Sequence, residues 1–101
     1  MFIGHEVKQP NEDYTISADF NPDLLEGETI TSFTVSSRLE VDDSDTTSDL
    51  LDPDPFELDG VIAQELIGTQ EEGEIHVVTF AVTTSLRPMI EREIRVIIRE
   101  D

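Results

Sequence analysis

The sequence of 101 residues contains no cysteine, no tryptophan and a single lysine. Without cysteine the chain forms no disulfide, offers no thiolate nucleophile and builds no cysteine-ligated zinc site. No stretch approaches the roughly 18 consecutive apolar residues of a membrane-spanning helix, so no membrane partner is expected. A signal peptide is not expected either, because Glu6 and Lys8 interrupt the beginning of the chain.

Positive charge is also scarce. Lys8 and Arg38 are the only cations within residues 1–86, whereas the whole chain has 24 acidic residues and a formal net charge of −18. Such a surface repels phosphate, so nucleic acid is not an expected partner. Self-repulsion destabilises a compact state, but salt screens it, since the Debye length falls to about 3 Å at 1 M. The composition favours a halophilic host; an acidic domain of an ordinary host, selected for solubility, is the alternative.

Alternation of apolar and polar residues dominates the rest of the chain, and helical spacing is absent at any useful length. The alternation predicts five strands, at residues 13–20, 28–41, 60–67, 74–85 and 90–99. Residues 68–73, between two glycines, are expected to form a hairpin loop. Five strands at this spacing indicate an all-β chain and an antiparallel β-sandwich in a single domain, residues 1–101.

The parity of the apolar positions predicts the core. Ile30 has the opposite parity from Phe33, which predicts a bulge near Thr31 and Ser32. The predicted core residues are those with inward parity in the strands: Tyr14, Ile16, Phe20, Phe33, Val35, Phe80, Val82, Ile94 and Val96.

Two segments are expected to lie outside the strands. The N-terminus, about residues 1–10, is expected to be mobile. Residues 42–59 read as an acidic loop, because Pro53 and Pro55 exclude a central strand or a helix interior. The apolar residues of its second half, Leu50, Leu51, Phe56 and Leu58, are candidates for contact with the core.

The acidic loop offers oxygen ligands of the kind that Ca²⁺ and Mg²⁺ prefer. Its carboxylates do not follow the spacing of an EF-hand, which needs a glycine at the sixth position and a glutamate at the twelfth. A solvated loop is therefore the favoured interpretation, and no metal site is predicted. Divalent binding there stays open as an alternative.

Residues suited to catalysis are few. The only imidazoles are His5 and His76, and His76 is expected to be a histidine on a strand surface. No Gly-x-Ser-x-Gly motif is present, and no base is paired in sequence with a hydroxyl nucleophile. The sequence therefore predicts a protein that is not an enzyme and has no cofactor.

The C-terminal strand holds the remaining cations. Arg92 shares parity with the inward-facing Ile90 and Ile94, whereas Arg95 and Arg99 have outward parity. These arginines are the candidate protein-contact residues, which would dock on an acidic neighbour or on another copy of the chain. The alternative is pairing with the chain's own acidic body. The full candidate set is Arg87, Arg92, Arg95 and Arg99.

Both ends of the chain resemble a known family. Residues 12–20 give an acid, an aromatic and an alternating strand, and residues 25–32 give a leucine, a glycine and an acid-Thr-Ile turn. At the other end, a Thr-Ser turn at residues 82–85 precedes a charged strand at residues 91–96. In this order the segments resemble small immunoglobulin-like proteins encoded among tailed-phage structural genes, often described as fibre–tail adaptors or small virion proteins.

The resemblance implies an immunoglobulin-like fold and a non-enzymatic structural role in a virion assembled in the host cytoplasm. Such a protein adapts fibres or other components to the tail or neck, and its expected partners are other virion proteins or further copies of itself. Two alternatives stay open: a capsid decoration or turret protein, and a salt-adapted cellular β-sandwich binding module. One tyrosine and no tryptophan argue against a carbohydrate-binding module.

Overall fold

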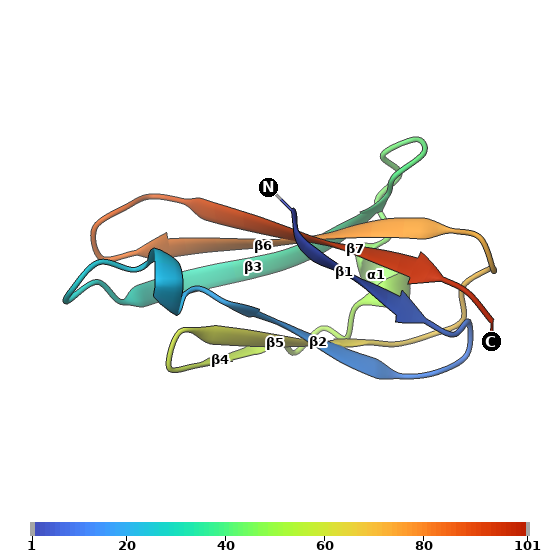
Figure 1. Ribbon diagram of the computed structural model, residues 1–101, viewed down its shortest axis with the longest axis horizontal. Coiled ribbons are helices and arrows are strands. Elements are labelled where there is room, and N and C mark those ends of the chain that lie inside the picture. The colour runs from blue at the N-terminus through green and yellow to red at the C-terminus, as the bar shows by residue number, and fades with distance from the viewer. Residues whose placement is uncertain (1, 101) are drawn as a thin grey trace.

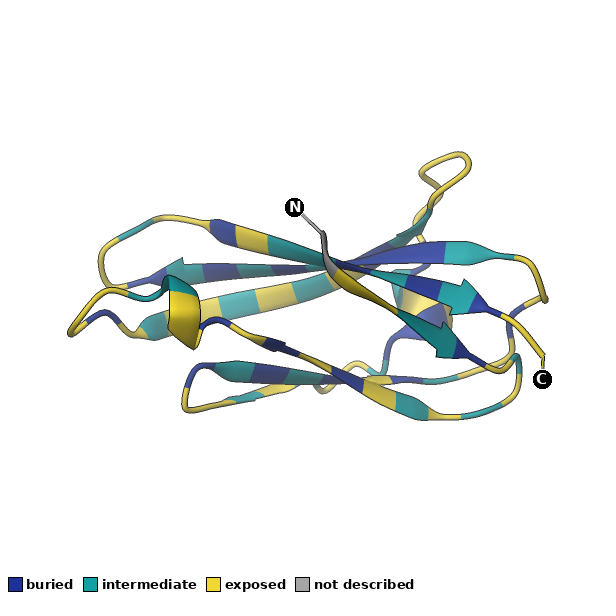
Figure 2. Cartoon of the chain, viewed as in Figure 1, coloured by how far each residue is buried: buried dark blue, intermediate teal, exposed yellow. Residues whose placement is uncertain are grey.

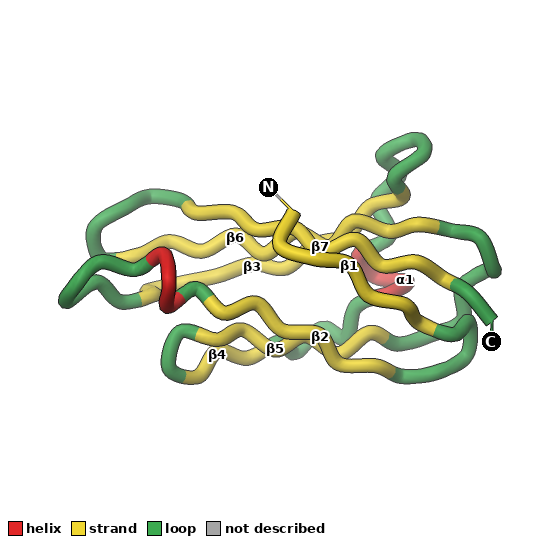
Figure 3. Tube along the Cα trace, viewed as in Figure 1, coloured by secondary structure: helices red, strands yellow, loops and turns green. Residues whose placement is uncertain are grey.

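Two β-sheets packed face to face make up the computed structural model, which describes residues 2–100 (Figure 1). The strands are β1 (Phe2–Lys8), β2 (Tyr14–Asp19), β3 (Ile30–Leu39), β4 (Phe56–Leu58), β5 (Val61–Leu66), β6 (Ile75–Thr84) and β7 (Ile90–Ile98). Helical structure is limited to a 3₁₀ turn, η1 (Asn21–Asp23), and one α-helical turn, α1 (Thr47–Leu50) (Figure 3). The prediction of an all-β sandwich is confirmed.

The larger sheet has the strand order β1-β7-β6-β3, and the smaller has the order β2-β5-β4. All neighbouring strands are antiparallel except β1, which runs parallel to β7. The edge strands are therefore β1 and β3 in one sheet and β2 and β4 in the other. Each of the five predicted strands is present, with ends within two residues of the prediction.

The core lies between the sheets, where dark and light bands alternate along the strands of Figure 2. Six of the nine predicted core residues are buried. The other three, Tyr14, Phe33 and Val35, are partly buried against the same cluster. Strand β3 shifts register between Ile30 and Ser32, which confirms the predicted bulge. The six buried members are Ile16, Phe20, Phe80, Val82, Ile94 and Val96.

The N-terminus contains a strand that the alternation did not predict. Residues 2–8 form β1, which pairs with β7 at the edge of the larger sheet, and Met1 lies outside the described residues. The side chain of Lys8 is fully buried at the end of β1 and is held there by hydrogen bonds. The alternation of apolar and polar residues did not predict β1, because the strand has mixed polarity and ends at a buried lysine.

The expected hairpin at residues 68–73 is wrong. Strand β5 pairs with β2 and β4, and β6 pairs with β3 and β7, so this loop crosses from one sheet to the other. The side chain of Gln70 is buried and donates to the carbonyl oxygens of Ile67 and Asp49. The loop is thus an anchored crossover.

Residues 42–59 are only partly a loop. They include α1 and the short edge strand β4, and within them Leu50 and Leu51 are buried as expected. Phe56 and Leu58 do not reach the core: they are 61% and 64% exposed. Their strand pairs with β5 at the sheet edge, and alternation puts both side chains on the outer face.

Candidate protein-contact site

Arg87, the first of the four candidate arginines, is bound inside the domain. It lies in the turn between β6 and β7, and its Nε and Nη2 donate to the two carboxylate oxygens of Glu28 at 2.8 and 2.6 Å. Glu28 is 5% exposed and also accepts from the Thr84 hydroxyl and the Leu25 amide. The Arg87 guanidinium, helped by Thr84, lowers the pKa of Glu28 to about 2. This bidentate pair holds two loops together at one end of the sandwich.

Arg92, which has inward parity in β7, forms an ion pair at the same end of the sandwich. Its Nη2 lies 2.6 Å from Oδ1 of Asp23, in η1, and its side chain is mostly buried. The guanidinium ties the C-terminal strand to the turn that follows β2.

Arg95 belongs to a row of charges on the outer face of the larger sheet. Its Nε donates to Glu40 at 2.6 Å, while Arg38 bridges to Glu93 at 3.1 Å. Val77 lies between the two arginines in register and is fully buried although it faces outward. The arginine stems therefore cover an apolar residue while their charges pair along the sheet.

Arg99 follows β7 and is exposed. Among residues 2–100, no carboxylate lies within ion-pairing distance of its guanidinium. Of the four candidates, then, three have partners in the chain's own acidic body, which is the alternative that the sequence left open. Arg99 is the candidate whose charge is available to a neighbour.

A second surface was not predicted. Phe56 and Leu58 pair across the sheet with Ala63 and Val61, which are on the same outer face of the smaller sheet. We call these four residues the apolar patch. Contiguous apolar surface of this kind marks contact sites in proteins that are otherwise polar. The available signal was the alternation of Phe56, Glu57 and Leu58, but the prolines before it favoured a loop.

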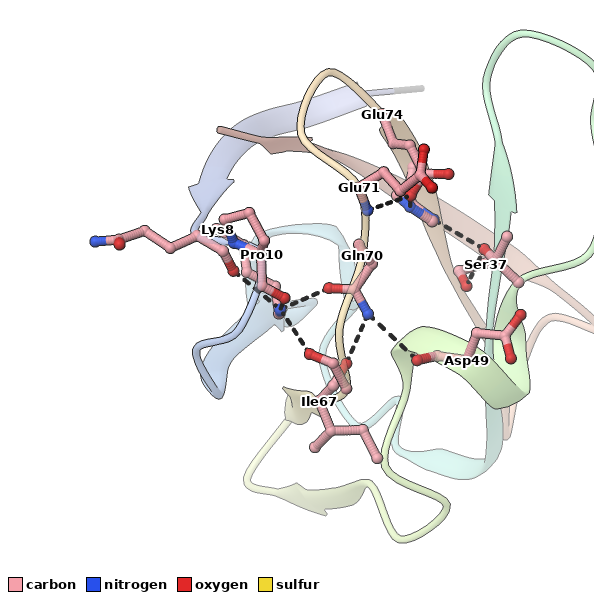
Figure 4. A network of polar contacts seen from close by, with 12 residues as sticks. Lys8, Pro10, Ser37, Asp49, Ile67, Gln70, Glu71 and Glu74 are labelled. Carbon is pink, nitrogen blue, oxygen red and sulfur yellow. Dashed lines mark hydrogen bonds and ion pairs between the residues drawn. The ribbon is translucent and has the colours of Figure 1, made fainter. Parts of the chain in front are cut away.

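The buried polar residues have structural partners instead. The ammonium of Lys8 donates to Gln70 Oε1 at 2.6 Å and to the carbonyl oxygens of Gln9, Pro10 and Gly68 (Figure 4). Burial lowers the pKa of Lys8. Gln70 thus links β1 to the crossover loop and to α1.

His76 is buried, so its expected position on a strand surface is wrong. Its Nδ1 lies 3.0 Å from the Thr46 hydroxyl and its Nε2 lies 3.2 Å from Glu74. The Thr46 hydroxyl in turn contacts Ser37 Oγ at 2.8 Å. These contacts bind the segment before α1 to the larger sheet, and they account for both ring nitrogens.

Within the described part of the chain, no group of three or more histidine, aspartate or glutamate side chains is arranged to hold a metal ion. No helix there is long and apolar enough to span a membrane.

Comparison with known proteins yields no relative. No family model matches the sequence, and neither the curated proteins nor the solved structures include a significant match.

Proposed function

We propose that this chain is a non-enzymatic structural subunit of a tailed-virus particle, which joins fibres or other components to the tail or neck. The observation that carries the proposal is the apolar patch. Phe56 and Leu58 are 61% and 64% exposed on a chain whose net charge is −18. Exposed phenylalanine and leucine side chains on one sheet face give a rigid domain a surface for a permanent neighbour.

The strand arrangement supports an immunoglobulin-like fold, as the resemblance at the chain ends implies. Lettering β2 to β7 as B to G makes the smaller sheet B-E-D and puts G, F and C side by side in the larger one. These are the sheet partners in the immunoglobulin sandwich. Strand β1 then occupies the position of an A strand that has moved to G.

Charge explains how such a subunit would assemble. Three of the four C-terminal arginines are occupied by Glu28, Asp23 and Glu40, so the docking role proposed for this set falls on Arg99. The apolar patch needs no opposite charge on its partner. In a salt-rich host the repulsion between acidic subunits is screened within about 3 Å at 1 M, and apolar contact then decides the assembly.

Incorporation into particles tests the proposal. Particles are prepared from cells that produce the unchanged chain, a Phe56→Ser/Leu58→Ser variant, or the control Val41→Ser, which removes an apolar side chain that is 88% exposed elsewhere. We expect the unchanged chain and the control to sediment with particles, and the double variant to stay in the soluble fraction while keeping its β-sheet circular dichroism. Equal incorporation of the double variant would overturn the role of the patch.

The alternatives predict different distributions in the same experiment. A capsid decoration or turret protein would sediment with tailless capsids as well as with complete particles. A cellular binding module would stay soluble in all preparations, which would overturn the virion role.

A further inference from the structure

The four edge strands differ in charge. Strand β1 contains Glu6, β2 contains Asp19 and β4 contains Glu57. Strand β3 contains no carboxylate, and it is also the longest edge, with 10 residues. Its one charged residue, Arg38, lies at the end of the strand where Asp45 forms a bridge with it. Proteins normally protect sheet edges with charges, and unprotected edges pair with other strands. In a chain with 24 acidic residues, the exception at β3 points to a function of this edge.

Alternate residues of β3 direct their backbone N–H and C=O groups away from β6. Ser37 accepts from the Thr46 amide and donates its own amide to the Thr47 hydroxyl, so its polar groups face away from β6. By alternation, the N–H and C=O groups of Phe33 and Val35 face the same way. Among the described residues no hydrogen bond reaches them. Two residues of β3 thus present free donors and acceptors.

Only the middle of this edge is accessible. Residues 44–47 cover it at one end, where the Leu39 amide donates to Ser44, and the bulge between Ile30 and Ser32 interrupts it at the other. Residues 32–36 remain, which we call the open edge. Their exposed side chains are serine and threonine, and Phe33 and Val35 are partly buried.

We propose that the open edge pairs with the open edge of a second copy, antiparallel about a two-fold axis at Thr34. The two-fold axis gives two pairs in which Phe33 of one copy lies opposite Val35 of the other. In each pair, the two residues form two N–H···O hydrogen bonds with each other. The small side chains of the two Thr34 residues face each other. The two larger sheets become one continuous sheet, and the interface is isologous.

The absence of charged residues from the open edge favours a second copy of the chain as its partner. Two chains of net charge −18 repel each other, and carboxylates would meet carboxylates at the other edges. At the open edge neither copy contributes a charge, and the half-buried Phe33 and Val35 cover each other. The pairing is therefore expected in high salt and not in dilute buffer. It does not depend on the proposed role in a virion.

Amide exchange measured by NMR tests the pairing directly. In molar KCl, we expect the Phe33 and Val35 amides to become protected as the protein concentration rises, and sedimentation to show a dimer. The Thr34 and Ser36 amides face β6 and are protected at all concentrations. A monomer at every concentration would overturn the proposal. So would a dimer in which the Phe33 and Val35 amides stay unprotected, which would indicate association through another surface.

A pair of variants at one position provides the control. Val35→Pro removes the outward amide, and an edge strand accepts proline where its N–H faces solvent. Val35→Ala also removes the branched side chain but keeps the backbone amide. We expect the alanine variant to dimerise in high salt and the proline variant to remain a folded monomer. A folded proline variant that dimerises like the unchanged chain would overturn the proposal. If the proline variant does not fold, the exchange pattern of the unchanged chain decides.

Discussion

Arg87 holds Glu28 with two hydrogen bonds, at 2.8 and 2.6 Å, and thereby joins the β6–β7 turn to the loop before β3. Burial of the carboxylate disfavours its charged form, but the hydrogen bonds from Arg87, Thr84 and Leu25 outweigh this effect and stabilise the charge. Removing one partner of such a pair leaves the other without compensation. The pair is therefore expected to contribute to the stability of this end of the sandwich.

Glu28→Gln is expected to lower the melting temperature by several degrees at pH 7. The control is Glu26→Gln, an exposed neighbour whose substitution changes the net charge equally. Because the control only relieves repulsion, its melting temperature should equal or slightly exceed that of the unchanged chain. Thermal melts by circular dichroism measure both. Equal effects of the two substitutions would mean that the pair contributes no stability.

The same pair predicts a pH dependence. The pKa of Glu28 is about 2 in the folded chain, below its ordinary value of 4.5. A depressed carboxyl pKa stabilises the fold above pH 4.5, and this contribution disappears as pH falls towards 2. The difference in melting temperature between the unchanged chain and Glu28→Gln should therefore shrink from pH 6 to pH 2. A constant difference would contradict the assigned protonation.

Lys8 and Gln70 should behave as one unit. Lys8→Met removes the donor of Gln70 Oε1 and of the Gly68 carbonyl oxygen, and a buried polar group without a partner costs about 1–3 kcal/mol. The carbonyl oxygens of Gln9 and Pro10 keep the backbone amides of Glu12 and Gln70 as donors. We expect Lys8→Met and Gln70→Leu each to destabilise the chain, and the double variant to lose less than the sum of the two. Urea unfolding of all three variants measures the coupling. Strict additivity would mean that the two side chains act independently.

A comparison of two phenylalanine substitutions tests which positions belong to the core and which to the surface. Phe80 is fully buried, whereas Phe56 is 61% exposed. Phe80→Ala should lower the free energy of unfolding by about 3–5 kcal/mol. Phe56→Ala should change it by no more than about 0.5 kcal/mol, because the ring lies on the outer face. Denaturant unfolding compares the two, and a small loss for Phe80→Ala would contradict the assigned core.

Salt should stabilise the chain strongly. With 24 acidic and six basic residues, self-repulsion opposes folding unless ions screen it. The melting temperature is expected to rise by many degrees between dilute buffer and molar KCl, and to rise much less with sucrose at matched osmolality. A melting temperature that does not respond to KCl would show that the internal ion pairs already offset the repulsion, and would remove the support for a halophilic host.

Alternation was sufficient to predict five strands, the bulge in β3 and most of the core, because period-2 burial is a local property of the sequence. It could not predict β1, whose buried Lys8 depends on acceptors from distant segments. It also failed for the crossover at residues 68–73, since two glycines mark a turn without saying which sheet follows. The apolar patch was missed for a similar reason: whether Phe56 faces the core or solvent depends on where its strand joins the sheet.

The central claim is that this chain is a particle subunit that docks through the apolar patch, and imaging of native particles by electron cryomicroscopy tests it most directly. We expect a seven-stranded sandwich at the tail or neck, with Phe56 and Leu58 buried against a neighbouring protein. Particles that lack this density, or that contain it with the apolar patch facing solvent, would contradict this role.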